Sequence, residues 1–463
     1  MLLLWIVLFA PLIIFSPAAE AVKRENFKTC EQSGFCKRNR AFADATSSNV
    51  PGISAYRLDS SSVKHSIGQI RATILKTVSG SETVRLPFDI TLYKSGVARV
   101  TIDEEKRRNG EIELRHGSKA RKERYDEADS WALVGEPNID KSATLTAQTQ
   151  EGITTITYGD SLRNAIKIRH HPFSIEFARD GDTQVVFNRQ GLLNIEQWRP
   201  KIEAESSEGN STDGDSNEDE STWWEESFGG NTDSKPKGPE SVAVDISFLG
   251  YQHVFGIPEH TGPLSLRETR GKSRNSYTDP YRMYNSDVFE YELDSPMTLY
   301  GSIPFMHAHR KDSTIEAAES QNPDSRPSRV GTETHWFSES GLLDVFVFLG
   351  PTPNDITKAY GELTGFTQLP QEFAIAYHQC RWNYMSDEEV KDVNRGFDRH
   401  SIPYDVIWFD LEYTDDRKYF TWDSHKFPDP LGMQDHLNLR HRKLVTLIDP
   451  HIKTPETTLS LKS

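Results

Sequence analysis

Two carboxylates follow a short apolar strand in the last quarter of the chain. The run Val406–Phe409 contains no polar residue except the Trp408 indole, and Asp410 and Glu412 come directly after it. Such a run is typical of a parallel strand that lies buried on both faces. A carboxylate at the end of this strand costs desolvation energy unless a partner or a ligand compensates it. In a (β/α)8 barrel the active site lies at that end of the strands, so the spacing predicts a binding site at Asp410.

Two neighbouring segments end in the same kind of residue. The segment at 373–380 is followed by Trp382, and the segment at 443–451 ends in Asp449 and His451. Side chains at adjacent strand ends of a barrel converge on one pocket. Aromatic faces cover the C–H patches of a sugar, and carboxylates accept paired hydrogen bonds from its hydroxyls. The pattern therefore predicts a carbohydrate site.

Other interpretations compete for these residues. The strand-end groups could cap helices or pair with one another. Asp410, Asp449 and His451 could bind a metal through oxygen and nitrogen ligands, but no dense histidine cluster accompanies them. A Ser-His-Asp hydrolase is disfavoured because the chain lacks a G-x-S-x-G motif. We therefore expect no metal and no cofactor.

The elements around these residues predict parallel strands joined by crossover helices. A capping box at Ser386 begins a helix that runs to about Asp398, and a second helix is expected over about 430–441. The strand at 443–451 completes a β-α-β-α-β order. We assign 366–463 to the first three βα units of a (β/α)8 barrel that remains incomplete.

Upstream of the barrel, apolar residues alternate with polar ones. Short alternating segments with turn signals run from about residue 50 to 350, and they predict an all-β sandwich within a domain at 22–365. The pair Asp180-Gly181 is a hairpin signal. Residues 351–364 form a helix-like linker. Examples of the alternating segments are 69–75, 84–92, 97–102, 112–114, 154–158, 173–177, 242–248, 289–293, 298–300, 334–337 and 343–349.

One stretch interrupts this sandwich. Ten acidic residues and no Lys or Arg occur over 203–226. Such a segment buries too little apolar surface to offset its ordering entropy, so we expect disorder over about 203–238. Trp223-Trp224 either anchors the stretch on the sandwich or docks a partner. Asn210 begins an Asn-Ser-Thr sequon and is a candidate glycosylation site.

Composition and N-terminus indicate a secretory protein. A net charge of −16 argues against binding to nucleic acid or to an anionic membrane. Residues 1–21 are predicted to be a signal peptide, with a signal anchor as the alternative. In an oxidising compartment Cys30 and Cys36 favour a local disulfide over a metal pair. We expect Cys380 to be free and buried.

Several long segments resemble glycoside hydrolase family 31. The resemblance covers nearly everything from Cys30 to Lys453 except the acidic stretch. Segments similar to the start of the family's catalytic barrel are HQCRWNY, YDVIWFDLEYTDD, RKYFTWD and DPHIK. Segments similar to the preceding sandwich, which is galactose-mutarotase-like, are HVFGIPEH, DPYRMYNSDVFEYELDSPMTLYGSIPFM and ETHWFSESGLLDVFVFLGPTP.

The resemblance implies an alpha-glucosidase of N-glycan processing. It implies hydrolysis of terminal α-1,3-linked glucose from glycoprotein glycans, with retention, in the lumen of the endoplasmic reticulum. A non-catalytic beta subunit is the implied partner. Residue by residue, the resemblance implies that Asp410 and Asp287 bind the glucose and that Phe289 and Trp382 form walls of the sugar site.

The resemblance also implies that the catalytic nucleophile and acid/base are expected beyond Ser463. A retaining reaction needs both carboxylates, so we expect this chain alone to be inactive. The alternative to an enzyme is a truncated, inactive product that acts only as a carbohydrate-binding or beta-subunit-binding β-sandwich module.

Overall fold

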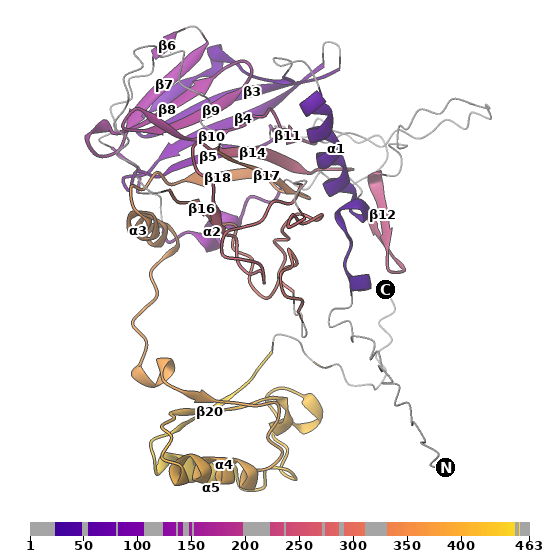
Figure 1. Cartoon of the computed structure of the whole chain (residues 1–463), viewed down its shortest axis with the longest axis vertical. Helices are drawn as coiled ribbons and strands as arrows, with labels where there is room; N and C mark the ends of the chain where they lie inside the picture. Colours follow the sequence, from indigo (N-terminus) through magenta and orange to yellow (C-terminus); the bar gives the residue numbers. More distant parts are fainter. Residues whose placement is uncertain are drawn as a thin grey trace, which may run out of the picture. The chain divides into compact units, whose positions relative to one another are not determined.

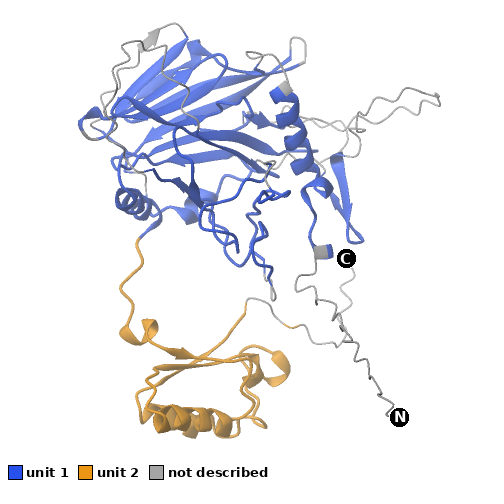
Figure 2. Ribbon diagram, in the orientation of Figure 1, with its two compact units in different colours: residues 1–365 blue, residues 366–463 orange. Residues whose placement is uncertain are grey.

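The chain divides into two compact units, Met1–Gly365 and Phe366–Ser463 (Figure 2). Asn210, Asp287, Phe289 and His451, together with the predicted signal peptide, lie outside the described residues. Within the described part, no helix is both long and apolar enough to span a membrane. The computed structural model describes residues 24–48, 54–79, 82–105, 124–135, 138–141, 148–150, 152–197, 223–235, 238–270, 274–286, 291–310, 331–449 and 453.

Unit 1 is built on two antiparallel sheets (Figure 1). The first has the order β1-β3-β4-β5-β18, with β2 paired to β3. Its last pair joins strands far apart in sequence, because β18 closes the sheet against β5. The strands are β1 (Tyr56–Leu58), β2 (Lys64–Ser66), β3 (Gln69–Ser79), β4 (Glu82–Leu92), β5 (Ala98–Ile102) and β18 (Leu343–Val347).

The second sheet has the order β11-β14-β10-β9-β8-β7-β6, with β17 paired to β14. The predicted hairpin at Asp180-Gly181 is confirmed between β9 and β10, where both turn residues have positive φ. The strands are β6 (Gln148–Gln150), β7 (Ile153–Tyr158), β8 (Asn164–Arg169), β9 (Ser174–Arg179), β10 (Asp182–Phe187), β11 (Asn194–Ile195), β14 (Val242–Phe248) and β17 (Thr332–Ser338).

The core of unit 1 lies between these sheets. In β4, Phe88, Ile90 and Leu92 are fully buried while the residues between them are more exposed, as the alternating pattern predicts. The ring of Phe88 packs edge-on against Phe173, which directly precedes β9, at 5.6 Å between centroids. The sandwich is therefore held by apolar side chains that alternate along strands of both sheets.

Helix α1 (Gly34–Ser48) packs beside the sheets, and the sequence analysis did not predict it (Figure 1). A disulfide joins Cys30 and Cys36 at its start. Arg38 donates two hydrogen bonds to Glu196, at 2.6 and 3.0 Å. Burial raises the pKa of Glu196, but Arg38 and the hydrogen bonds from Ser241 together outweigh burial and hold the pKa below its usual value.

Other elements of unit 1 are shorter. Helix α2 spans Ala128–Ala132, and α3 (Pro353–Thr364) forms the expected linker helix behind the capping residue Thr352. Strands β15 (Val254–Gly256) and β16 (Met306–Ala308) pair as a separate hairpin. No strand occurs over 291–300, so the strands expected in that range are wrong there.

The expectation of disorder over 203–238 is wrong for residues 223–235. Strands β12 (Glu225–Phe228) and β13 (Asn231–Ser234) form a hairpin there. Trp224 is buried against Gly238, and Glu226 forms ion pairs with Lys28 and Lys235. These contacts order the end of the stretch and support the anchoring interpretation of the tryptophan pair; residues 203–222 lie outside the described ranges.

Unit 2 is a parallel β-α-β-α-β unit, as the sequence predicts. Strands β19 (His378–Gln379), β20 (Val406–Phe409) and β21 (Lys443–Thr446) form one sheet with β20 in the centre. Helices α4 (Asp387–Arg399) and α5 (Pro430–Asn438) lie on one face of it (Figure 1). The expected cap of α4 is confirmed, because Ser386 accepts a hydrogen bond from the Glu389 N–H.

Two expectations about the start of unit 2 are wrong. The strand expected over 373–380 is reduced to the two residues of β19, because Glu372–Ile375 form a 3-10 helix and β19 is an edge strand with one partner. Cys380 is free, but it is exposed rather than buried, since it already lies in the loop after β19.

Candidate functional site

Asp410 lies at the carboxyl end of the central strand β20. It is the N-cap of a 3-10 turn, η8 (Leu411–Tyr413), and its Oδ1 accepts a hydrogen bond from the Leu411 N–H at 2.8 Å. The side chain is half-buried. One carboxylate oxygen therefore fixes the local backbone, and the cap leaves acceptor capacity on the carboxylate for other donors.

Trp382 stands in the loop after β19, and 64 % of the residue is exposed. Its indole Nε1–H donates a hydrogen bond to Oε1 of Glu412 at 3.0 Å. Glu412 lies in η8, two residues after Asp410. The structure thus connects Trp382 to the turn that Asp410 caps, through a bond between residues 30 positions apart.

A cluster of aromatic side chains packs against that turn. Tyr413, the last residue of η8, is buried and donates its hydroxyl hydrogen bond to the Leu447 carbonyl at 2.8 Å. Its ring lies near Phe409 and Trp422, with centroids 6.5 and 5.6 Å away. Phe427 completes the cluster. Because these rings are packed among themselves, the turn carrying Asp410 and Glu412 has a rigid base.

Asp449 follows β21 and accepts a hydrogen bond from the Tyr419 hydroxyl at 2.9 Å. Burial, followed by this bond to a carboxylate, raises the pKa of Tyr419. Within the described residues no group of three or more His, Cys, Asp or Glu side chains is arranged to hold a metal ion. His451, the third residue of the metal alternative, lies outside those residues.

Two other residues of the predicted strand end, His378 and Arg381, form bonds within unit 2. Trp408 Nε1–H donates to Nδ1 of His378 at 2.8 Å, and the other ring nitrogen of His378 donates to the Phe373 carbonyl at 2.9 Å. Arg381 pairs with Glu389 at the start of α4. Here the interpretation that strand-end groups pair with one another holds.

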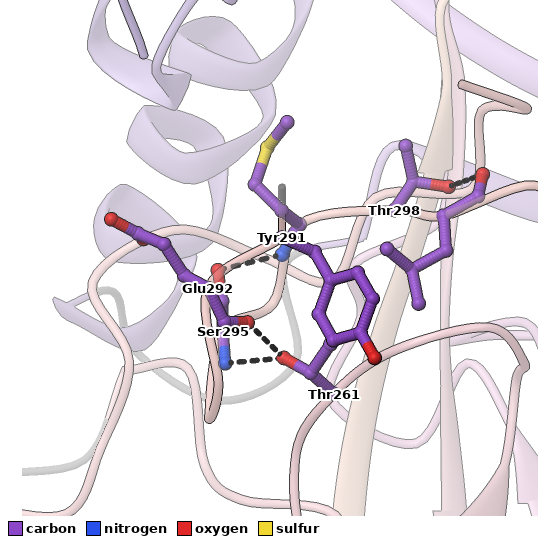
Figure 3. A pocket seen from close by; sticks show the side chains of 7 residues that line it. Thr261, Tyr291, Glu292, Ser295 and Thr298 are labelled. Atoms are coloured by element: carbon purple, nitrogen blue, oxygen red, sulfur yellow. Dashed lines mark hydrogen bonds between the residues drawn. The ribbon is translucent and has the colours of Figure 1, made fainter. Parts of the chain in front are cut away.

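Figure 3 shows a small pocket in unit 1, lined in part by Thr261 and by residues between 291 and 299. Thr261 Oγ1 donates to the Glu292 carbonyl at 2.6 Å and accepts from the Ser295 N–H at 3.2 Å. The space in it that a water molecule could occupy is only about 10 Å³, far less than the roughly 300–1,000 Å³ of typical ligand sites. Its polar groups bond within the protein, so it belongs to the loop scaffold.

A wider hollow of about 400 Å³ on the six-stranded sheet of unit 1 is lined by Arg99 and several carboxylates. Arg99 pairs with Asp344 at 2.6 Å and with Asp129 at 3.1 Å. Its guanidinium also lies over the Phe346 ring. These pairings make the hollow a structural ion-pair network.

The structure therefore assembles part of the predicted site. Asp410 and Trp382 are linked through Glu412, whereas Asp287 and Phe289 lie outside the described residues. The sequence analysis noted Glu412 only as a strand-end carboxylate and did not single out Tyr419. The adjacency of β19 and β20 was the signal for the Trp382–Glu412 contact, but sequence alone does not determine rotamers.

Comparison with known proteins defines the class of this fold and site. Residues 87–315 match the glycosyl hydrolase 31 N-terminal galactose mutarotase-like domain. Residues 367–462 match the TIM-barrel domain of the glycosyl hydrolases family 31. The chain therefore belongs to glycoside hydrolase family 31.

Within that family, the chain is similar to particular alpha-glucosidases. The chain is 40% identical to glucosidase 2 subunit alpha of Schizosaccharomyces pombe, over 96% of this chain and 48% of the relative. It is 35% identical to neutral alpha-glucosidase AB of Homo sapiens, over 94% of this chain and 47% of the relative. The chain thus spans about half the length of the curated relatives that it matches.

Solved structures agree with this assignment. A crystal structure of glucosidase II alpha subunit bound to Glc1Man2 superposes with a TM-score of 0.83 and 55% identity, over 93% of this chain and 47% of that one. An ER glucosidase II heterodimeric complex, of the catalytic subunit and the binding domain of the regulatory subunit, superposes with a TM-score of 0.83 and 57% identity, over 93% and 47%.

Proposed function

We propose that this chain carries the sandwich and the first sugar-holding strands of an alpha-glucosidase that removes terminal α-1,3-linked glucose from N-glycans. The observation that carries the proposal is the 40% identity to glucosidase 2 subunit alpha along 96% of this chain. The same fold in a glucosidase II alpha subunit holds Glc1Man2, a glucose-capped fragment.

The geometry of unit 2 supports this substrate. Asp410 lies at the carboxyl end of β20, where barrel enzymes bind their ligands. Its acceptor oxygens suit sugar hydroxyls, and Trp382 offers an exposed indole face from the neighbouring loop. In this proposal Asp410 orients the terminal glucose and Trp382 walls it, together with Asp287 and Phe289.

Bond cleavage needs two further groups. A retaining glycosidase uses a nucleophilic carboxylate and an acid/base carboxylate about 5–5.5 Å apart. We assign neither role to Asp410, because one of its oxygens caps η8 and no hydrogen bond among the described residues joins it to a second carboxylate. Asp410 holds the substrate, while the two reacting carboxylates come from other strands of a complete barrel.

The endoplasmic reticulum lumen is the proposed location, and a regulatory beta subunit is the proposed partner. The disulfide between Cys30 and Cys36 suits an oxidising compartment. A related catalytic subunit forms a heterodimer with the binding domain of a regulatory subunit. Residues 1–21 and Asn210 remain the proposed signal peptide and glycosylation site.

The proposal is tested with the longest natural protein that contains this sequence. Purified protein is incubated with a glucose-α-1,3-mannose-capped oligosaccharide and with a maltose-capped control, and released glucose is measured. Preferential release from the α-1,3 substrate with the α-anomer formed first supports the proposal. Release from neither substrate rejects it.

A second function is favoured by one observation. In the described residues of unit 2 the sheet has three parallel strands, whereas a closed barrel has eight. The 463-residue polypeptide by itself would then act as a non-hydrolysing module that binds carbohydrate or the beta subunit. Binding of the purified beta-subunit domain without glucosidase activity is the outcome that distinguishes this module from the enzyme.

A further inference from the structure

We infer that Glu412 is a positioning residue that fixes the indole of Trp382 at the rim of the sugar site. The inference rests on the proposed function, because it assigns Trp382 the role of a sugar-site wall. Trp382 is 64 % exposed in the loop after β19, so much of the residue is open to a ligand. An indole that must meet a sugar face in one orientation needs a restraint on that orientation.

The Glu412 carboxylate supplies that restraint. Its Oε1 accepts the indole N–H at 3.0 Å. A hydrogen bond to an ionised carboxylate is roughly twice as strong as one between neutral groups. The bond restricts rotation of the indole about its side-chain torsions, so it holds the ring in one orientation.

Glu412 acts through Trp382 rather than on a sugar directly. Oε1 is occupied by the indole, and Oε2 is buried without a hydrogen-bond partner in the described part of the chain.

The backbone that carries Glu412 is well anchored. Asp410 caps the start of η8, and Thr414 Oγ1 donates to the Leu411 carbonyl at its end. Tyr413 fixes the same turn in the aromatic cluster and bonds to the Leu447 carbonyl. One short turn therefore sets both the sugar-binding carboxylate and the orientation of the aromatic wall.

The experiment uses the longest natural protein that contains this sequence, labelled with 5-fluorotryptophan. Trp382→Phe assigns the fluorine resonance of Trp382 by its loss. We expect Glu412→Ala to shift or broaden that resonance while the other resonances stay in place. Glu412→Gln keeps an acceptor of the same length and should perturb the resonance less. Asp415→Ala removes an exposed carboxylate three residues away and serves as the matched control.

Kinetics give a second readout. If Trp382 contacts the sugar equally in ground and transition states, Glu412→Ala should raise KM by roughly three- to tenfold with kcat within about twofold. Glu412→Gln should recover most of that loss, and Asp415→Ala should match the parent. A folded Glu412→Ala protein with an unchanged Trp382 resonance and unchanged KM overturns the inference. If Glu412→Ala does not fold, the same two readouts are taken on Glu412→Leu, which also lacks the acceptor but keeps most of the side-chain volume, and unchanged values there overturn the inference.

The two proposals fail differently. If the parent protein releases no glucose, the proposed function is rejected, and the fluorine resonance alone then decides whether Glu412 holds the Trp382 indole. If the parent is active but the Trp382 resonance is unchanged in Glu412→Ala, the proposed function stands and the positioning role is rejected.

Discussion

Asp410 caps a turn, and we propose that the same carboxylate also binds the sugar. Its Oδ1 accepts the Leu411 N–H and begins η8, which is the task of an N-cap residue. The proposed second task, accepting hydrogen bonds from glucose hydroxyls, uses the remaining acceptor sites and the negative charge. The two tasks respond differently to substitution, which makes them separable.

Asp410→Asn should lower kcat/KM at least about 100-fold while changing the unfolding free energy by less than about 1 kcal/mol, because asparagine still caps the turn but lacks the charge. Steady-state kinetics and urea denaturation of the longest natural protein that contains this sequence check both values. Asp410→Ala, the comparison variant, should also lose the cap, at about 0.5–2 kcal/mol. An unchanged kcat/KM in Asp410→Asn would remove Asp410 from the site.

His335 makes the stability of unit 1 depend on pH. It lies in β17, and its Nε2 is buried with no hydrogen-bond partner in the described residues. Burial, with smaller contributions from the nearby Arg270 and Arg40, lowers the pKa of His335 to about 4. The charged form is thus disfavoured in the folded protein.

The unfolded chain has a histidine pKa near 6.5, so it binds the proton first as the pH falls. The neutral imidazole therefore contributes stability fully above about pH 6.5, and this contribution is lost between about pH 6.5 and 4, on the order of 3 kcal/mol. In His335→Gln the pH slope of the unfolding free energy over that range should become flatter. An identical slope in parent and variant would contradict the assignment.

At the scale of elements, Arg442 joins helix α4 to the sheet of unit 2. The side chain is buried and donates to Asn394 Oδ1 at 2.6 Å and to Asp398 at 2.9 Å. Its guanidinium lies 4.0 Å from the ring centre of Tyr404, the residue that leads into β20. The contact fixes the ends of the strands opposite the site.

Arg442→Met should destabilise unit 2 by roughly 1.5–3 kcal/mol, because it removes the buried cation that bonds to Asn394 and Asp398 and leaves them, among the described residues, only the Tyr404 hydroxyl and Arg440. Arg440→Met is the matched control: Arg440 is exposed and also pairs with Asp398, so its loss should cost less than about 1 kcal/mol. Hydrogen–deuterium exchange of peptides from α4 and β20 measures the local opening free energy. Equal protection in the two variants would refute a central role for Arg442.

Patterns with a strict local cause were predictable at this scale. The alternating residues of β4, the Asp180-Gly181 turn and the Ser386 cap each follow from side-chain period or backbone geometry, and each is present. Helix α1 was missed because its docking depends on the distant Glu196. The β12–β13 hairpin was missed because its order comes from partners outside the acidic run, namely Lys28 and Lys235 for Glu226 and Gly238 for Trp224.

The same division applies to the site. Asp410 was predictable because it follows a buried strand, and barrel architecture gives that position a meaning. The bond between Trp382 and Glu412 could not be predicted, because it depends on the rotamers of two side chains that lie in different loops. The assignment of Asp287 and Phe289 came from family resemblance alone, and both residues lie outside the described ranges.

At the scale of the molecule, unit 1 forms a complete sandwich, whereas the described part of unit 2 forms only part of a barrel. Unit 1 has two sheets that enclose one core, whereas the sheet of unit 2 has three strands in its described residues. A barrel site needs strands that converge from all sides. Unit 2 therefore presents one sector of such a site.

We accordingly predict that the 463-residue polypeptide alone releases no product from a chromogenic α-glucoside, because we assign to the described strands only the proposed substrate-holding Asp410 and not the pair of reacting carboxylates. A continuous absorbance assay measures the product released. A longer protein that contains the same residues is the positive control. Turnover by the 463-residue polypeptide that is absent in its Asp410→Asn variant would overturn the prediction.

The position of a bound sugar tests the account most directly. The measurement is a crystal structure of the longest natural protein that contains this sequence, soaked with a glucose-α-1,3-mannose disaccharide. We predict glucose hydroxyls within hydrogen-bond distance of Asp410, the indole of Trp382 beside the sugar, and the Trp382–Glu412 bond retained. A disaccharide bound away from the carboxyl ends of β19, β20 and β21, with Asp410 not in contact, would contradict the account.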